Sequence, residues 1–177
     1  MRKIIIVGPG ASGKDYLFDY LSKFFTRGIK TTTRPKRDGE IENYTYYYTN
    51  NEWFKSSINF DFDEEDKIII WEHFEKQDWY YGFTKKELNT KKVFIMTPYE
   101  INNFYGHLNN SFIIYINIDR DIRKKRLLNR SDEDSIKNRL ESDDKSFQDF
   151  GKYDIQITDP EFNCDEVLME ILDKINK

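Results

Sequence analysis

A glycine-rich loop that ends in lysine is the clearest chemical signal near the start of the sequence. The residues Gly8-Pro9-Gly10-Ala11-Ser12-Gly13-Lys14 have the spacing G-x-x-x-x-G-K of a loop that holds phosphate groups. Glycine lets the backbone turn so that successive N–H groups face one anion, and a helix after the loop adds the positive end of its dipole. Lys14 then reaches the outer phosphates as a point charge. The chemistry indicated is the binding of a nucleoside triphosphate, ATP.

This chemistry requires a strand before the loop and a helix after it. Ile4–Val7 is a continuous β-branched run that ends in glycine, as in a buried parallel strand, and residues 14–25 carry apolar side chains at helical spacing. A plain connecting loop is the other interpretation of the glycines, and the strand and helix around them favour phosphate binding. The residues predicted to bind ATP are Gly8, Gly10, Ala11, Ser12, Gly13, Lys14 and Asp15.

Asp15 stands where such a loop usually has a serine or threonine whose hydroxyl binds Mg²⁺. A carboxylate is also a hard oxygen ligand, although it adds negative charge beside the phosphates. Two roles remain open for Asp15. Either it binds Mg²⁺, directly or through water, or it is an acid in the first helical turn that interacts favourably with the helix dipole.

A second basic loop contains Arg34 and Arg37, two residues apart, between Thr33 and Gly39. Such a pair can hold one phosphate group through bidentate hydrogen bonds. A solvated basic turn is the alternative, and for the pair considered alone it is the preferred interpretation.

Four features together make the chain resemble the guanylate kinase family over nearly its whole length. They are the phosphate loop, the T-T-R-x-x-R-x-G-E stretch from Thr32 to Glu40, the turn Tyr80-Tyr81-Gly82, and an arginine-rich segment that begins at Arg120. The resemblance implies an ATP-dependent kinase that uses Mg²⁺. Its acceptor would be a nucleoside monophosphate, GMP or dGMP, and its products the diphosphate and ADP.

The resemblance also implies an acceptor site. In that family two arginines and two tyrosines hold the acceptor phosphate, and a glutamate nine residues before the second tyrosine accepts hydrogen bonds from guanine. For the first tyrosine, the alternative is an ordinary aromatic residue on a strand. For the glutamate, the alternative is a solvated acid at the end of a strand. The acceptor-binding residues implied are Arg34, Arg37, Glu40, Tyr46, Glu72 and Tyr81.

Three departures from the family pattern lie around recognition of the base. Lys30 stands in place of a serine, and Phe83 in place of a small hydroxyl residue. Met96-Thr97-Pro98 replaces a D-x-D-like strand end. The phosphate-binding positions, by contrast, are retained.

Three further arginines match residues that the family brings over ATP and the transferring phosphoryl group: Arg126, Arg130 and Arg139. Charge spreads over the equatorial oxygens in the transition state of phosphoryl transfer, and positioned arginines neutralise it. Together with Lys14, these are the predicted catalytic residues. Because lysines and further arginines lie nearby, a solvated charged helix face is the alternative for each of them.

The elements that must position these groups alternate between apolar strands and helical patterns, which indicates an α/β fold with a largely parallel sheet. Besides Ile4–Val7, strands are predicted at 44–49, 67–72, 93–96, 112–118 and 154–158, and helices at 14–25, 50–57, 120–145 and 163–175. Asp119 is predicted to cap the charged helix that follows it. Capping boxes are predicted for Thr49 with Glu52, Thr84 with Glu87, Thr97 with Glu100, Ser131 with Asp134 and Asn163 with Glu166.

We therefore predict a single guanylate kinase-like domain with three parts. The first is a three-layer P-loop core around a parallel sheet, formed by residues 1–32, 90–120 and 152–177. The second is a small mixed α+β insertion that binds the nucleoside monophosphate, residues 33–89, and the third is a helical lid, residues 121–151.

Composition limits the partners. The net charge of −4 gives no overall positive field for nucleic acid, and the N-terminal apolar run is too short for a membrane span. The single cysteine, Cys164, excludes an internal disulfide and a cysteine-rich metal site. We expect a cytoplasmic monomer or homodimer whose partners are small-molecule nucleotides.

Two alternatives to GMP phosphorylation stay open. Ribose-bisphosphate kinases resemble guanylate kinases and can carry Gly-Lys-Asp in the phosphate loop, as Gly13-Lys14-Asp15 does here, but Arg37 and Glu72 argue against a sugar acceptor. A non-catalytic guanylate kinase-like binding module is the other, although such modules have lost a working phosphate loop, and Gly13 and Lys14 are intact here.

Overall fold

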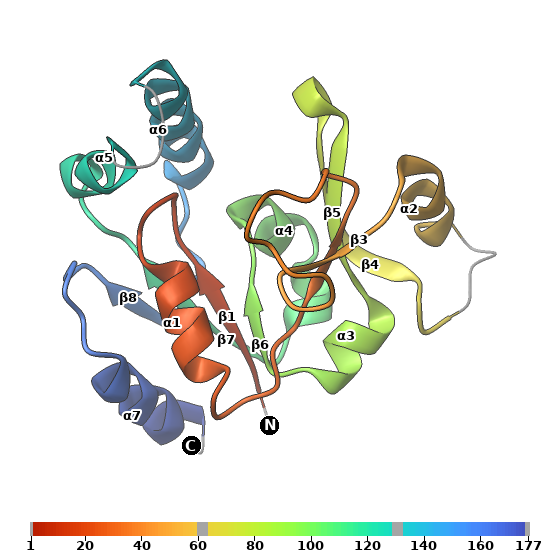
Figure 1. Ribbon diagram of the computed structural model, residues 1–177. Helices are drawn as coiled ribbons and strands as arrows, with labels where there is room; N and C mark the ends of the chain where they lie inside the picture. The colour runs from red at the N-terminus through yellow and green to blue at the C-terminus, as the bar shows by residue number, and fades with distance from the viewer. Residues whose placement is uncertain (1, 60–63, 129–132, 176–177) are drawn as a thin grey trace. The chain divides into compact units, whose positions relative to one another are not determined.

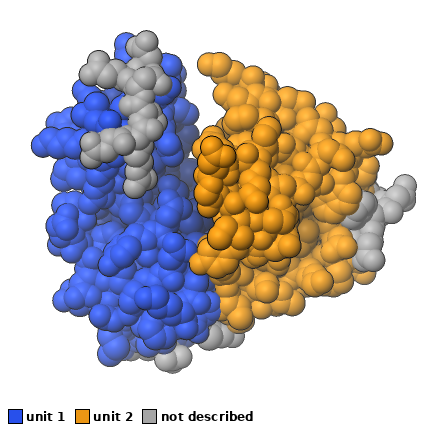
Figure 2. Space-filling view, in the orientation of Figure 1, with its two compact units in different colours: residues 1–25, 93–177 blue, residues 26–92 orange. Residues whose placement is uncertain are grey.

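The computed structural model describes residues 2–59, 64–128 and 133–175. The chain forms two compact units, which Figure 2 colours separately. Unit 1 comprises Met1–Phe25 and Val93–Lys177, and unit 2 comprises Thr26–Lys92. The phosphate loop belongs to unit 1, and the loop that carries Arg34 belongs to unit 2.

Unit 1 is built on a four-stranded sheet in the order β6-β1-β7-β8 (Figure 1). All neighbouring strands in it run parallel. The α/β fold with a parallel sheet is therefore confirmed. The strands are β1 (Lys3–Val7), β6 (Val93–Ile95), β7 (Ser111–Ile116) and β8 (Ile155–Ile157).

Both faces of this sheet are buried. Ile4 and Ile6 of β1 pack into a core with α1 (Lys14–Leu21) and α7 (Cys164–Ile175). Ile5 is also fully buried, and because side chains alternate along a strand it points to the opposite face. Burial on both faces explains why the strand reads as a continuous apolar run in the sequence.

Helices also lie on the opposite face, which completes three layers. Tyr115 of β7 is there, with its ring stacked on Phe147 of α6 (Glu133–Phe147) at a centroid distance of 5.5 Å. The short helix α4 (Pro98–Asn103), which contributes the fully buried Ile101, contacts α6. The turn η2 (Tyr105–Leu108) then leads into β7.

The charged segment predicted as one helix over 120–145 contains two helices, α5 (Arg120–Leu128) and α6. Asp119 caps the first of them, because its Oδ1 accepts from the amide of Asp121 at 2.8 Å. The predicted capping box of Ser131 with Asp134 lies outside the described residues and side chains.

Unit 2 contains a second four-stranded sheet, in the order β3-β2-β5-β4. Strands β2 and β3 are parallel, whereas β5 runs antiparallel to both β2 and β4. Phe54 is fully buried in the core of this unit beside Tyr80. The elements are β2 (Lys30–Thr32), β3 (Tyr46–Tyr48), α2 (Asn51–Ser57), β4 (Ile68–Phe74), η1 (Glu75–Gln77), β5 (Trp79–Thr84) and α3 (Lys85–Thr90).

The predicted helix starts are correct in part. Thr97 forms the full capping box with Glu100, and Pro98 occupies the first turn. Thr84 caps α3 by accepting from the Glu87 amide, but the Glu87 carboxylate accepts instead from the amide of Ile29 at 2.8 Å. Asn163 accepts from the Asp165 amide, one residue earlier than predicted.

Two sequence predictions are wrong. The N-cap of α2 is Asn50, which accepts from the Trp53 amide, so the predicted box of Thr49 with Glu52 does not form. Helix α1 ends at Leu21 instead of residue 25, and the Ser22 hydroxyl bonds back to the Phe18 carbonyl at 2.6 Å. Hydroxyl groups that bond to the local backbone compete with helical hydrogen bonds.

Over the described residues, no helix has the length and apolar character needed to cross a membrane.

Candidate phosphate and acceptor sites

The backbone of the phosphate loop adopts left-handed conformations at two positions. Gly13 has φ of 100° and caps α1, and Ala11 has φ of 60°. Glycine adopts this region without steric cost, whereas a residue with a Cβ is strained there. The turn at Gly13 places the loop directly at the N-terminus of α1, as an anion-binding loop requires.

Gly8 is required for packing rather than for its φ. A Cβ atom added to it would lie 2.8 Å from the carbonyl oxygen of Ile116, at the end of β7. The loop therefore passes closely over the neighbouring strand. This close approach is set by the parallel pairing of β1 with β7, in which Val7 lies opposite Tyr115.

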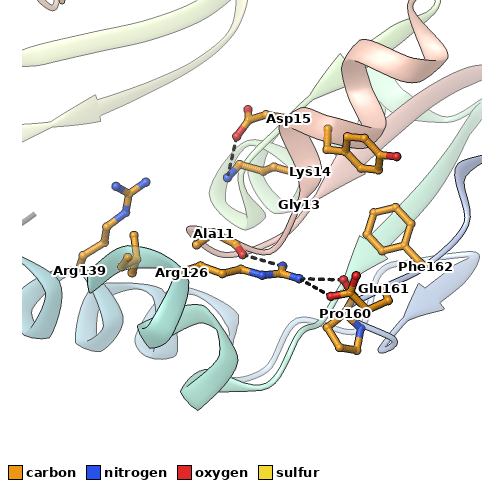
Figure 3. Close-up of a pocket in the computed structure, with 11 residues that line it drawn as sticks. Ala11, Gly13, Lys14, Asp15, Arg126, Arg139, Pro160, Glu161 and Phe162 are labelled. Carbon is orange, nitrogen blue, oxygen red and sulfur yellow. Dashed lines mark hydrogen bonds and ion pairs between the residues drawn. The ribbon is translucent and has the colours of Figure 1, made fainter. Parts of the chain in front are cut away.

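A cavity of about 780 Å³ opens beside the loop (Figure 3). This is a suitable size for a nucleotide-sized ligand. Four of the predicted ATP-binding residues line it, while Gly8, Gly10 and Ser12 are buried within the loop. The lining residues are Ala11, Gly13, Lys14, Asp15, Tyr16, Arg126, Leu127, Arg139, Pro160, Glu161 and Phe162.

Lys14 and Asp15 lie side by side at this cavity. The Lys14 ammonium is 4.0 Å from the Asp15 carboxylate and 3.5 Å from the Pro9 carbonyl oxygen. The Asp15 side chain is 83% exposed, so its oxygens are accessible to a ligand in the cavity. Over the described residues, no three His, Cys, Asp or Glu side chains are grouped so that they could hold a metal ion.

Arg126 connects α5 to the phosphate loop. Its guanidinium donates to the carbonyl oxygen of Ala11 at 3.2 Å and to that of Pro160 at 2.7 Å, as Figure 3 shows. Arg139 of α6 lines the same cavity. The third predicted arginine, Arg130, lies outside the described residues.

Sequence reasoning missed the aromatic wall of the cavity. Tyr16 and Phe162 face one another with ring centroids 6.1 Å apart. Phe162 belongs to the loop after β8, which ends at the same edge of the parallel sheet as β1. Ligands of parallel α/β folds bind outside the carboxyl ends of the strands. This rule could have identified the loop after β8 as part of the site.

In unit 2, Arg34 is buried in a hydrogen-bonded loop. Its guanidinium donates to Glu40 at 2.5 Å and to the carbonyl oxygen of Pro35 at 2.8 Å. Burial is the largest single influence and acts to lower the pKa of Arg34, but the hydrogen bond to Glu40 and the electrostatic effects of Tyr81, Glu40 and Tyr46 together outweigh it and raise that pKa. Arg34 therefore remains a cation although its side chain is only 4% exposed.

Glu40 is the centre of this loop. Its second oxygen accepts from the Arg37 amide and from the Tyr48 hydroxyl, each at 2.8 Å. Burial favours a higher pKa for Glu40, but the hydrogen bonds from Arg34, the Arg37 amide and Tyr48 lower the pKa to about 2. For Tyr48, burial and the bond to Glu40 raise the pKa to about 12.

Two predicted tyrosines lie against Arg34. The guanidinium is 5.2 Å from the ring centre of Tyr46, and the rings of Tyr46 and Tyr81 are 5.9 Å apart in an edge-on arrangement. Burial raises the pKa of Tyr81, so its phenol keeps its proton and can donate. Glu72 lies opposite Tyr81 in the pairing of β4 with β5.

Unit 2 thus brings together Arg34, Glu40, Tyr46 and Tyr81, with Glu72 on the neighbouring strand. The side chain of Arg37 is exposed, and its backbone takes part in the loop: its amide donates to the Glu40 carboxylate, and its carbonyl oxygen accepts from the Glu40 amide at 3.2 Å. Two residues that depart from the family pattern are also in contact, since the Lys30 ammonium lies 5.3 Å from the ring centre of Phe83.

The chain is similar to guanylate kinases in sequence and in structure. A family model described as guanylate kinase matches residues 1–176. The guanylate kinase of Mycoplasma genitalium is 25% identical, and the match covers 96% of this chain and 73% of that protein. For the guanylate kinase of Helicobacter pylori strain 26695 the identity is 27%, with 95% and 84% covered.

Solved structures share the fold, and one of them is a guanylate kinase. The crystal structure of guanylate kinase from Anaplasma phagocytophilum superimposes with a TM-score of 0.74. The two sequences are 19% identical, and the match covers 99% of this chain and 87% of that one.

Proposed function

The chain belongs to the guanylate kinase family, and we propose that it transfers the γ-phosphoryl group of ATP to GMP or dGMP. The products are ADP and the nucleoside diphosphate. The observation that carries the proposal is a buried arginine, Arg34, held by Glu40 and flanked by Tyr46 and Tyr81, in a chain that also has a phosphate loop. A cation and neutral phenol donors together suit a phosphate monoester.

The donor site is the cavity beside the phosphate loop. The Gly10 amide already donates to a carboxylate of the protein, so the loop amides that follow it and the N-terminus of α1 bind the phosphates of ATP, and Lys14 contacts the outer ones. The apolar wall of Tyr16, Pro160 and Phe162 is suited to the purine ring, because aromatic faces pack well on a flat base.

The residues at the cavity fit a magnesium ion held mainly by the nucleotide. Mg²⁺ keeps several waters and takes only one or two protein carboxylates beside substrate phosphates. Asp15 is the carboxylate next to Lys14, and it is accessible. When bound, the ion would neutralise charge that builds up between the β- and γ-phosphates.

At the acceptor site, we assign Glu40 to Arg34 rather than to the acceptor itself. Both Glu40 oxygens already accept hydrogen bonds from the protein, and a carboxylate beside a phosphate dianion would repel it. Glu40 therefore orients Arg34. We assign Glu72, which lies opposite Tyr81 on the neighbouring strand, to accept from the adjacent N1–H and amino group of guanine.

Catalysis in this scheme is positioning and charge neutralisation. The acceptor phosphate is already an anion, so no general base is needed. Arg126 and Arg139 stabilise the charge that spreads over the transferring group, and a lid formed by α5 and α6 excludes water. We place this reaction in the cytoplasm, in a monomer or homodimer.

The test is a steady-state assay of ADP formation with GMP, dGMP, AMP, CMP, UMP and a ribose bisphosphate as acceptors. Turnover confined to GMP and dGMP is expected, and Lys14→Ala and Arg34→Ala should abolish it. Turnover with the ribose bisphosphate alone would show that the acceptor is a sugar phosphate and not GMP. Saturable Mg·ATP binding without any turnover would indicate a non-catalytic binding module.

A further inference from the structure

A carboxylate of the protein is bonded to the phosphate loop. The Oδ2 atom of Asp143, on α6, accepts a hydrogen bond from the amide of Gly10 at 2.8 Å. The two residues are 133 positions apart in the sequence, so this contact joins the lid helix directly to the loop that follows β1. None of the roles assigned above uses Asp143.

The contact is part of a docking face on α6. Ile136, Arg139, Leu140 and Asp143 follow the spacing i, i+3, i+4 and i+7, which places them on one side of a helix. Ile136 and Leu140 are buried in a small core against which Ala11 of the phosphate loop packs. The helix therefore contacts the loop through apolar groups and through Asp143.

Gly10 permits the closest approach. A Cβ atom at this position would lie 2.7 Å from Nε of Arg139 and 3.0 Å from Oδ2 of Asp143. Arg139 is thus held over the loop at the same glycine whose amide bonds to Asp143. The hydrogen bond and the placement of the arginine are two parts of one contact.

The carboxylate is also held from its other side. Arg123 of α5 is buried, donates to the Ile118 carbonyl oxygen at 3.0 Å and lies 3.5 Å from Asp143. Asp144, the next residue, pairs with Arg123 at 3.4 Å and Arg120 at 2.8 Å. The two acids therefore share Arg123, but Asp143 is the one bonded to the loop.

We propose that Asp143 is a positioning residue for phosphoryl transfer: its hydrogen bond to Gly10 fixes α6 on the phosphate loop and so holds Arg139 over the donor cavity. An anion cannot itself stabilise a transferring phosphoryl group, so Asp143 acts through Arg139. The inference rests on the proposed function, because Arg139 is assigned there to the transferring group.

The first test compares Asp143→Ala with Asp144→Ala, a neighbouring acid that shares Arg123. Misplacement of a catalytic group by about 1 Å can cost about 100-fold in rate, so Asp143→Ala should lower kcat by about 10- to 100-fold. KM for GMP should change little, because the acceptor residues belong to unit 2. Asp144→Ala should keep kcat within about twofold. Equal losses in the two variants would overturn the inference.

Asp143→Asn separates the hydrogen bond from the charge. Asparagine retains an oxygen that can accept from the Gly10 amide, so this variant should keep most of the activity that alanine loses. If asparagine lost as much as alanine, the effect would lie in the charge pairing with Arg123, and the proposed role would be wrong.

A double-mutant cycle with Arg139→Ala tests whether Asp143 acts through that arginine. In the Arg139→Ala background, Asp143→Ala should have little further effect on kcat, because the group that it positions is gone. A loss as large as in the wild-type background would show that Asp143 serves only general stability and would overturn the proposal.

Hydrogen–deuterium exchange gives a readout that does not depend on turnover. Asp143→Ala should speed exchange in peptides that cover α6 and the phosphate loop, and Asp144→Ala should not. If wild-type protein fails to phosphorylate GMP, the proposed function fails while exchange still tests the anchor. If exchange is unchanged in Asp143→Ala while the wild type is active, the anchor alone is wrong.

Discussion

The buried guanidinium of Arg34 donates to one carboxylate oxygen of Glu40 across 2.5 Å. The other oxygen of Glu40 accepts hydrogen bonds from the Arg37 amide and the Tyr48 hydroxyl, so the orientation of the carboxylate does not depend on Arg34 alone. Arg34 is thereby pre-oriented with a ring of tyrosine beside it. Preorganisation of this kind lowers the entropic cost of ligand binding.

Replacing Glu40 with glutamine should therefore weaken acceptor binding without touching the donor site. Loss of a charge-assisted bond that orients Arg34 should raise KM for GMP by about tenfold, the equivalent of about 1.4 kcal/mol. KM for ATP should be unchanged. Glu42→Gln is the matched control, since Glu42 is exposed nearby and accepts only a 3.3 Å bond from the Tyr48 amide among the described contacts. Initial-rate measurements with each substrate varied would check this.

The same acid should make stability depend on pH. Its pKa is lowered from 4.5 to about 2 in the folded protein, so the folded state binds fewer protons than the unfolded chain in this interval. The stabilisation is present above pH 4.5 and is lost as the pH falls through 4.5 toward about 2. Urea unfolding of wild type and Glu40→Gln should show the gap between their free energies of unfolding narrowing over that range. A gap that stayed constant would contradict the assignment.

Gly10→Ala should lower activity more than stability. The added Cβ would meet the ends of Arg139 and Asp143, which can move away at small cost, but the arginine would then leave its place over the loop. We expect kcat to fall by about tenfold or more while the melting temperature changes by a few degrees. Gly106→Ala is the control, because a Cβ there meets no atom within 4 Å. Unchanged kcat in Gly10→Ala would mean that the contact with α6 has no role in turnover.

Asp15→Asn should raise the magnesium concentration needed for half-maximal activity, because a neutral amide is a weaker ligand for a hard cation. Asp19→Asn, on an exposed position of the same helix, should leave the magnesium dependence unchanged. Titrations of magnesium at fixed nucleotide would check both variants. If both variants kept the magnesium dependence of the wild type, Asp15 would not be a magnesium ligand, and its role would be the favourable interaction with the dipole of α1.

The parallel core of unit 1 could be predicted because its signals are local. Ile4–Val7 is apolar on both faces, and the motif that follows requires a strand and a helix around it. Thr97-Pro98-Tyr99-Glu100 specifies a helix start by its own hydrogen bonds, and the structure contains both halves of that box. Such features depend little on the rest of the chain.

In unit 2, β3, α2 and β4 correspond to predicted elements, but strands β2 and β5 and the lid contacts were not predicted. Strand β2 has three residues, Lys30–Thr32, without apolar alternation, and it exists because β3 and β5 pair on its two sides. Asp143 lies in a charged run in which the residue types do not distinguish it from Glu141 or Asp144. Its spacing from Ile136 was the signal, and only the packing of α6 shows which acid reaches the loop.

The position of β1 within its sheet also bears on how the protein is made. Ile4 pairs with Val93 of β6 on one side and with Phe112 of β7 on the other. Strand β1 therefore cannot be paired until these two strands, which lie much later in the sequence, have been synthesised. A ribosome releases the phosphate loop long before the neighbours that support it, and the whole of unit 2 is translated in between. Closing such distant pairings is slow and leaves apolar strands exposed meanwhile. Nascent chains halted before Ser111 lack β7, so they should not bind ATP and should bind chaperones instead. ATP should stabilise only the complete folded chain, because it binds the native state.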